Sequence, residues 1–264
     1  MPLAERAGHP TFWQVFGNGP RPALAIHCTL AHSGAWAGVA ARLPGLALTA
    51  FDMPGHGQSG PWAGNDYHGD VTRIAASFID RPLDLIGHSF GASVALRLAA
   101  AAPEAIRSLT LIEPVLFVAA AGTPEFAAQE ADNERFRALI AAGEHEVAAR
   151  AFVGQWGAGQ AWEKLDPRAR AAFAAQMPLV LAGGVANFTD TARILRVGGL
   201  EAIEAPVMLI RGAQSPSIMA LVCEAIAARL PDVGVAVVPG AGHMLPVTHP
   251  AQVADLIGLN LSRE

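Results

Sequence analysis

The sequence has little of several residue types, and each shortage excludes a class of protein. Its 264 residues include only two cysteines, Cys28 and Cys223, which are too few for a disulfide framework. Charged residues make up 16% against 52% hydrophobic residues, so disorder is excluded for most of the length and there is ample material for a core. With 18 basic and 23 acidic residues, the chain also lacks the basic excess that a nucleic-acid-binding protein of this size needs.

The N-terminal segment lacks the apolar stretch of a secretory signal, because Glu5 and Arg6 are followed by turn-forming residues. The segment 171–189 lacks charge, but Gln176, Pro178 and a glycine pair interrupt it. We therefore expect buried helix, turn and loop in this segment rather than a membrane span. The resulting expectation is a soluble cytoplasmic protein with no membrane and no nucleic acid among its partners.

Short apolar runs alternate with helical patterns along most of the chain. Continuous apolar runs are typical of parallel strands that are covered on both faces, and right-handed crossovers between them give a doubly wound sheet. The sequence therefore predicts an α/β fold with a doubly wound, mostly parallel sheet. The expected strands are 23–27, 46–51, 83–87, 109–112, 207–210 and 234–238, and the expected helices between them are 33–43, 70–78, 90–102, 217–230 and 249–259.

The alternation stops between residues 114 and 200, where the sequence shows helical patterns but no convincing strand. Helices are expected at 125–142, 144–152 and 166–177. This organisation predicts one α/β core, made of residues 1–113 and 201–264, with an all-helical insertion at residues 114–200.

Residues 87–91 read G-H-S-F-G and fit the pattern G-x-S-x-G, between an expected strand and the helix that begins at Phe90. A sharp strand-to-helix turn strains the backbone at the serine, and the flanking glycines leave room for the neighbouring chain. The turn presents the Ser89 hydroxyl at the carboxyl end of the sheet, over a helix N-terminus. Ser89 is therefore a candidate nucleophile.

A serine hydroxyl is a poor nucleophile and needs a base. His243 lies in the loop 240–246, directly after the last expected strand. Because the carboxyl ends of parallel strands meet at one edge of a sheet, this loop can face Ser89. His249, by contrast, precedes Pro250 and leads into the final helix. His243 is therefore the candidate base.

Four motifs together resemble those of the α/β-hydrolase superfamily, in its capped, lid-bearing branch. They are H-C at 27–28, D-M-P-G-H-G-Q-S at 52–59, G-H-S-F-G at 87–91 and G-H-M-L-P at 242–246. The resemblance implies the α/β-hydrolase fold, with a helical cap inserted after the strand that follows the nucleophile's helix. The segment before residue 23 is short, so the leading antiparallel hairpin usual in relatives is expected to be reduced. No histidine pair has metal-ligand spacing and no glycine-rich phosphate loop opens a helix, so neither a metal nor another cofactor is expected.

The resemblance places the oxyanion hole at two backbone N–H groups. One belongs to Phe90, the residue after the nucleophile. The other belongs to Thr29, in the loop after the first core strand, with Leu30 as the neighbouring alternative. Many relatives have glycine where this chain has Cys28, which we expect to be a packed residue rather than a catalytic thiol.

The resemblance also guides the choice of the triad's acid. Relatives most often carry Asp in the loop that here spans 211–216, where the equivalent residue is Ser215 and cannot hold a charge. A variation in the superfamily puts the acid after the strand that follows the nucleophile's helix, and this chain has Glu113 there. The order Ser89, Glu113, His243 then fits, with Glu113 orienting His243. The alternative is a buried carboxylate that shapes the connection into the cap.

The insertion is expected to cover Ser89 and to form the pocket for a small-molecule substrate that is neutral and partly apolar. Trp156 and Phe117 are the candidate pocket residues of the insertion, and His32 and Met244 are those of the core. The alternative for His32 is a role at the start of the helix expected at Ser33. The alternative for most of the insertion's aromatic residues is that they pack the cap onto the core.

These assignments predict a serine hydrolase that cleaves a small carboxylic ester, lactone or thioester through a covalent acyl-enzyme. Serine rather than aspartate at position 89 argues against haloalkane dehalogenase and epoxide hydrolase chemistry. The same residues would serve hydrolysis of a carbon–carbon bond next to a ketone, a perhydrolase or an acyltransferase. An alternative of another class, motivated by Ser215, is a catalytically inactive ligand-binding protein on the same fold.

Overall fold

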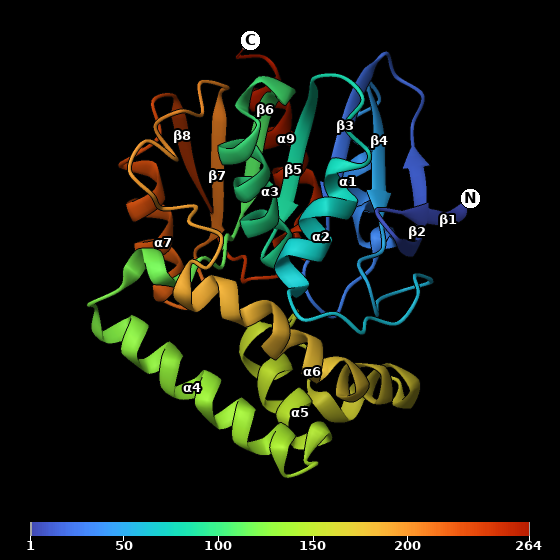
Figure 1. Cartoon of the computed structure of the whole chain (residues 1–264), viewed down its shortest axis with the longest axis vertical. Coiled ribbons are helices and arrows are strands. Elements are labelled where there is room, and N and C mark those ends of the chain that lie inside the picture. The colour runs from blue at the N-terminus through green and yellow to red at the C-terminus, as the bar shows by residue number, and fades with distance from the viewer. Residues whose placement is uncertain (1, 264) are drawn as a thin grey trace.

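The computed structural model describes residues 2–263, in which eight strands form one mostly parallel sheet with helices on both faces (Figure 1). The order across the sheet is β1-β2-β4-β3-β5-β6-β7-β8. The pairs β1–β2 and β2–β4 are antiparallel, and all other pairs are parallel. The strands are β1 (Leu3–Arg6), β2 (His9–Phe16), β3 (Arg21–Ile26), β4 (Leu46–Phe51), β5 (Leu83–His88), β6 (Ile106–Ile112), β7 (Val207–Gly212) and β8 (Val233–Val238).

Helices cover both faces of the sheet, which confirms the predicted fold class. One face packs against α1 (Ala37–Ala40) and α9 (Pro250–Leu261), and the other packs against α2 (Tyr67–Ala76), α3 (Phe90–Ala101) and α7 (Ile218–Ala227). Successive strand residues point to opposite faces, so Leu85 and Ile86 of β5 belong to two different buried clusters. Because both faces are covered, every residue of β5 is buried, and its one charged residue, Asp84, pairs with Arg21.

Three long helices lie between β6 and β7 in the sequence, at the sheet edge where the parallel strands end (Figure 1). They are α4 (Pro124–Ala141), α5 (His145–Trp156) and α6 (Pro167–Thr189), and the turns Phe117–Ala120 and Trp162–Lys164 are 3₁₀ helices. Side-chain caps define where α4 and α6 begin. The Thr123 side chain accepts the Phe126 N–H at 3.2 Å, and the Asp166 side chain accepts the Arg168 N–H at 2.8 Å. A proline occupies the first turn of each of these two helices.

Helix α6 is longer than the sequence predicts. The expectation of a helix ending at 177, followed by turn and loop, is wrong, because the helix runs through Pro178 to Thr189. Proline removes one backbone donor, but packing against α2, α4 and α5 holds the helix together. A Cβ at Gly183 would lie 2.7 Å from the Phe90 ring, so this glycine serves the close approach of α6 to α3. By length and composition alone, α6 is the one helix in the described chain that is apolar enough to cross a membrane.

The N-terminal hairpin is complete, so the expectation of a reduced hairpin is wrong. Strands β1 and β2 pair in register from Leu3 opposite Phe12 to Arg6 opposite His9. Their connection has positive φ at Ala7 (49°) and Gly8 (82°), the conformation that tight hairpin turns require.

Two helix starts also differ from the sequence prediction. Asp66 rather than Asp70 caps α2, accepting the Gly69 N–H at 2.9 Å. The helix expected at 33–43 divides into the 3₁₀ turn Ser33–Trp36 and the short α1. The remaining short helix of the core, α8 (Leu245–Thr248), follows the loop that carries His243.

Because Gly91 has no side chain, α3 packs directly against the backbone of β3. A Cβ at Gly91 would lie 2.2 Å from the Ile26 carbonyl oxygen of β3, whereas a Cβ at Gly258 of α9 would meet nothing within 4 Å. We therefore expect Gly91→Ala to lower the free energy of unfolding by roughly 3 kcal/mol, since backbone has to move. Gly258→Ala, the matched control, should raise it by up to about 1 kcal/mol, because alanine favours a helix interior. Urea unfolding measures both, and equal effects of the two changes would contradict this packing.

Four buried histidines of the described chain, His27, His56, His68 and His88, have a lowered pKa and make the stability of the fold depend on pH. Burial lowers the pKa of His56 and His68 to about 4 and that of His88 to about 3. The unfolded chain takes up these protons near pH 6.5 and the native chain only at a much lower pH, so the free energy of unfolding falls as the pH falls below that value. Between pH 6.5 and pH 5 the expected loss is about 2 kcal/mol for each histidine. Equal free energies of unfolding at the two pH values would contradict their burial in the neutral form.

Candidate active site

Ser89 occupies a strained turn between β5 and α3. Its φ of 56° lies in the left-handed region, which a residue with a Cβ adopts only at a cost. The flanking glycines permit this turn: a Cβ at Gly87 would lie 2.4 Å from the Gly91 carbonyl oxygen. Ser89 is 5% exposed and directly follows β5, whose end lies at the edge of the sheet that faces α4–α6 (Figure 1).

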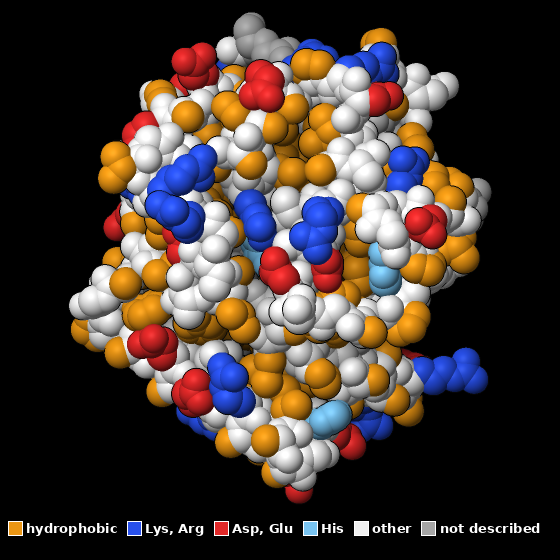
Figure 2. All heavy atoms as spheres, in the orientation of Figure 1, with side chains coloured by type: hydrophobic (Ala, Val, Ile, Leu, Met, Phe, Trp, Pro, Cys, Tyr) orange, Lys and Arg blue, Asp and Glu red, His pale blue; other side chains and the backbone are white. Residues whose placement is uncertain are grey.

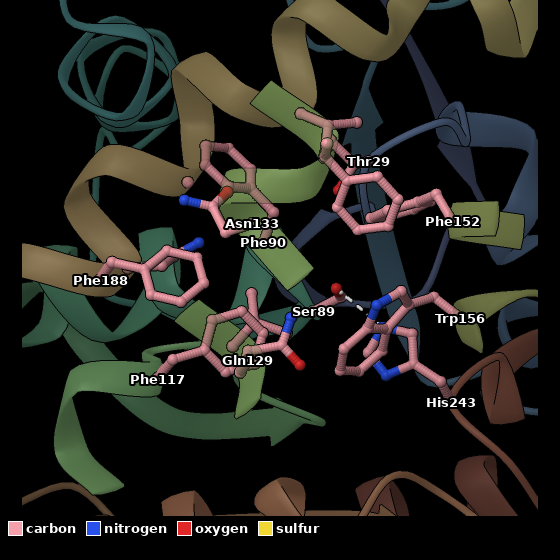
Figure 3. A pocket seen from close by; sticks show the side chains of 15 residues that line it. Thr29, Ser89, Phe90, Phe117, Gln129, Asn133, Phe152, Trp156, Phe188 and His243 are labelled. Atoms are coloured by element: carbon pink, nitrogen blue, oxygen red, sulfur yellow. Dashed lines mark hydrogen bonds between the residues drawn. The ribbon is translucent and has the colours of Figure 1, made fainter. Parts of the chain in front are cut away.

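The structure joins the three candidate triad side chains in one line. Ser89 Oγ lies 2.9 Å from His243 Nε2 (Figure 3). On the other side of the ring, His243 Nδ1 lies 3.0 Å from Glu113 Oε2. The three residues follow β5, β8 and β6, so the parallel strands bring them to one edge of the sheet although 154 positions separate Ser89 from His243. Glu113 is fully buried, and its φ of 51° lies in the left-handed region.

Ser215, at the position where relatives carry an acid, contacts Glu113 directly. Its Oγ donates to Glu113 Oε1 at 2.8 Å, and the Gly212 N–H donates to the same oxygen at 2.7 Å. Two donors thus hold Oε1 and leave Oε2 for His243. Glu113, which follows β6, therefore contacts His243. Ser215, in the loop after the neighbouring strand β7, holds the Glu113 carboxylate in place.

The backbone N–H groups expected to form the oxyanion hole are available. Among the described residues, none accepts a hydrogen bond from the N–H of Thr29 or Phe90. The alternative donor, Leu30, is engaged, because its N–H donates to His56 Nε2 at 3.1 Å. Burial raises the pKa of the Cys28 thiol to about 12, which keeps it protonated and unreactive.

Two adjoining compartments open beside Ser89 under α4–α6. Six Phe and Trp residues help to line the compartment that contains Ser89 and His243, and Trp156 packs edge-on against His243 at a ring distance of 4.8 Å (Figure 3). Its other lining residues are Thr29, Phe90, Val115, Phe117, Gln129, Asn133, Phe136, Phe152, Val180, Gly184, Asn187 and Phe188. The second compartment shares Thr29, Phe152 and Trp156 with the first and adds Met244 and apolar residues of α5 and α6.

The sequence profile of the alpha/beta hydrolase family matches residues 23–256. The chain belongs to the alpha/beta hydrolase family. The resemblance seen in the four sequence motifs is thereby confirmed.

Named relatives of this α/β hydrolase include a lipase and a methyl ester esterase. It is 38% identical over 103 residues to lipase LipV of Mycobacterium tuberculosis, a match that covers 38% of this chain and 39% of that protein. It is 36% identical over 119 residues to a pimeloyl-[acyl-carrier protein] methyl ester esterase of Methylococcus capsulatus, covering 45% and 43%. Both matches thus span about two fifths of the relative's length. The enol-lactonase of Burkholderia xenovorans LB400 superposes with a TM-score of 0.78 at 18% identity, over 99% of this chain and 100% of that one, which shows a shared fold.

Two buried residues of the sequence motifs, His88 and Asp52, support the site of the α/β hydrolase without lining its pocket. His88 Nε2 lies 2.9 Å from the His243 carbonyl oxygen and thereby ties the His243 loop to the end of β5. Asp52 accepts the N–H of Ser33 at 2.6 Å and that of Gln58 at 2.8 Å, which fixes the loop 52–59 below the pocket. Both residues hold backbone segments in place.

Not every pocket residue proposed from the sequence lies in the pocket. Phe117 and Trp156 line the first compartment and Met244 the second. His32, however, is exposed and lines neither compartment: its Nδ1 accepts the Gly34 N–H at 3.1 Å and caps the 3₁₀ turn, so its assignment to substrate binding is withdrawn.

Three carboxamide residues of the hydrolase's pocket were not predicted from the sequence. Gln129 and Asn133 of α4 and Asn187 of α6 line the same compartment as Ser89. No signal in the sequence singled them out, because polar residues spaced along a helix ordinarily form its solvent-exposed face.

Charge is evenly distributed on the molecular face seen in Figure 2, where acidic and basic side chains are interspersed. Within residues 2–263, no three His, Cys, Asp or Glu side chains are grouped in a way that could hold a metal ion. The first compartment is lined by no charged side chain apart from the ionisable ring of His243.

Proposed function

We propose that this α/β hydrolase is a serine hydrolase that cleaves a small carboxylic ester, lactone or thioester through a covalent acyl-enzyme. The observation that carries the proposal is the unbroken hydrogen-bonded line from Ser89 Oγ through His243 to the buried Glu113. Relatives named as a lipase and as a methyl ester esterase support ester chemistry, and the fold is shared with an enol-lactonase.

In the first half-reaction, Ser89 Oγ forms a bond to the substrate's carbonyl carbon while its proton passes to His243 Nε2. The carbonyl oxygen becomes an oxyanion, which the N–H groups of Thr29 and Phe90 stabilise. When the carbon–oxygen or carbon–sulfur bond to the leaving group breaks, His243 returns the proton to that group. Glu113 holds the imidazole in the tautomer that can accept the proton at Nε2 and stabilises the imidazolium that results.

In the second half-reaction, water replaces the leaving group. His243 Nε2 takes a proton from the water as its oxygen bonds to the acyl carbon. The second tetrahedral intermediate then collapses, the bond to Ser89 Oγ breaks, and the proton returns to the serine. The products are a carboxylic acid and the free enzyme.

The helical segment 114–200 acts in this proposal as a substrate-binding cap on a core made of residues 1–113 and 201–264. It supplies Phe117, Trp156 and most of the other aromatic lining of the compartment around Ser89. Because the described lining is mostly apolar and carries no fixed charge, the substrate class that fits is small, neutral and partly apolar.

A panel of acyl substrates tests the proposal. The protein is expected to hydrolyse at least one series among short-chain methyl esters, thioesters and lactones, with release of the free acid measured by titration. Addition of competing alcohols separates hydrolysis from acyl transfer, since a transferase would form a new ester in place of the acid. Absence of turnover across the whole panel, with correctly folded protein, would contradict the proposal.

A further inference from the structure

The compartment beside Ser89 contains a cluster of three carboxamides, Gln129, Asn133 and Asn187, which we call the amide cluster. Gln129 and Asn133 lie one turn apart on α4 and therefore share a face of that helix. Asn133 faces α6, because its Oδ1 would lie 3.7 Å from a Cβ at Gly184, one turn before Asn187. Figure 3 shows the Gln129 and Asn133 side chains among the aromatic rings of the pocket.

The amide cluster has hydrogen-bonding capacity that the described chain does not use. Asn187 is only 3% exposed, and its Oδ1 has no hydrogen-bond partner. Gln129 is 7% exposed, and neither it nor Asn133 makes a side-chain hydrogen bond to any described residue. Buried polar groups without partners are costly, and large apolar residues would fill this space at lower cost. The cluster is therefore built to be completed by a bound group.

The chemistry of the cluster restricts that group. Each carboxamide offers an acceptor oxygen and a donor NH₂, so the group that satisfies them both donates and accepts hydrogen bonds. Among residues 2–263, no Lys or Arg lines the compartment to offset the desolvation of an anion, and no Asp or Glu lines it to bind a cation. A hydroxyl is the smallest uncharged group that meets both demands.

The position of the cluster tells which part of the substrate it meets. The leaving group takes its proton from His243 Nε2 and must therefore lie on the side of His243. In Figure 3, His243 and Trp156 lie on one side of Ser89, whereas Asn133, Phe117 and Phe188 lie on the other. The second, apolar compartment includes Met244, next to His243 in the chain, and suits the leaving group. The acyl chain accordingly extends into the amide cluster.

We infer that the amide cluster makes this enzyme selective for esters whose acyl chain carries an uncharged hydroxyl at a distance from the scissile carbonyl. This inference rests on the proposed serine-hydrolase function and names its substrate class. A carboxamide oxygen of Gln129 or Asn133 accepts from the substrate hydroxyl, while the NH₂ group of Asn187 donates to it.

Matched methyl esters test the inference. Three series of straight-chain acyl groups of graded length are compared, which end in a hydroxyl, a methyl or a carboxylate in otherwise equivalent chains. The wild-type enzyme is expected to show a kcat/KM at least about tenfold higher for the best hydroxyl member than for its methyl counterpart, because a site built for a hydroxyl rejects the analogue that leaves its polar groups unpaired. The carboxylate members should be the poorest substrates.

Substitutions in the amide cluster test whether it is the source of the preference for hydroxyl-bearing esters. Asn187→Leu and Gln129→Met each replace a carboxamide by an apolar side chain of similar size, and each should reduce or reverse the preference for hydroxyl over methyl. Gln252→Met, an equivalent change at an exposed position of α9, should leave the preference unchanged. The ratio of the two kcat/KM values is the readout, so a general loss of active protein cancels.

The outcomes distinguish a failure of the inferred selectivity from a failure of the proposed hydrolase function. Equal rates for hydroxyl and methyl members, a preference for carboxylate members, or a hydroxyl preference that survives both cluster variants would overturn the inference while ester hydrolysis itself persists. Absence of hydrolysis in every series would instead count against the proposed function.

Discussion

Ser89→Ala is expected to lower kcat for ester hydrolysis by on the order of 10⁴- to 10⁶-fold, because the acyl-enzyme cannot form without the serine oxygen. The residual rate would come from the oxyanion hole and from substrate binding alone. The loss should appear in kcat, measured by titration of released acid, and the far-UV spectrum and urea unfolding midpoint should stay close to those of the wild type. Ser262→Ala, an equivalent change at an exposed site near the C-terminus, serves as the control and should retain full activity.

A Ser89→Ala enzyme with more than about a tenth of wild-type kcat would show that the serine is not the nucleophile, since loss of a nucleophile costs far more than this. The hydrogen bond between Ser89 and His243 would then have only a structural role.

Glu113→Gln is expected to lower kcat by roughly 10²- to 10⁴-fold with a smaller change in KM, because it leaves the pocket shape intact and reverses a hydrogen bond. The glutamine oxygen can still accept from Ser215 Oγ and the Gly212 N–H, as Glu113 Oε1 does. Its NH₂ group then faces His243 Nδ1 and favours the tautomer with the proton on Nε2. That tautomer cannot accept the proton of Ser89.

Ser215→Ala is the matched control for Glu113→Gln. It removes one of the two donors to Oε1 and leaves the contact between Oε2 and His243 in place. We expect kcat to fall by less than about tenfold, which corresponds to one neutral-donor hydrogen bond. If Glu113→Gln retained wild-type kcat while losing stability, Glu113 would serve only to shape the connection between β6 and the helices above it.

Most of the core fold and the candidate triad can be predicted from the sequence because each has a strong local signal. The short, mostly apolar segment of β5 identifies a strand, and G-x-S-x-G at its end identifies the turn at Ser89. The rule that parallel strands end at one sheet edge then brings the His243 loop and Glu113 into range, and the structure places all three side chains within hydrogen-bond distance.

The features that the sequence did not predict depend on contacts between distant segments. Helix α6 continues through Pro178 because neighbouring helices support it, and Gly183 is needed only where Phe90 approaches. In the sequence Asn187 is an ordinary polar residue, and only the fold shows that it is buried. His32 looked like a pocket residue by its place after β3, but a local backbone hydrogen bond captures its ring. Local patterns therefore predict elements and motifs, while the lining of the pocket depends on the tertiary packing.

The central claim is that Ser89 is a hydroxyl made nucleophilic by His243. The most direct measurement is reaction of the folded protein with a serine-directed fluorophosphonate, followed by mass spectrometry of the peptides. We predict one label per chain, located on Ser89, absent from Ser89→Ala and formed much more slowly in Glu113→Gln. Absence of labelling, or a label on another residue that persists in Ser89→Ala, would contradict the claim.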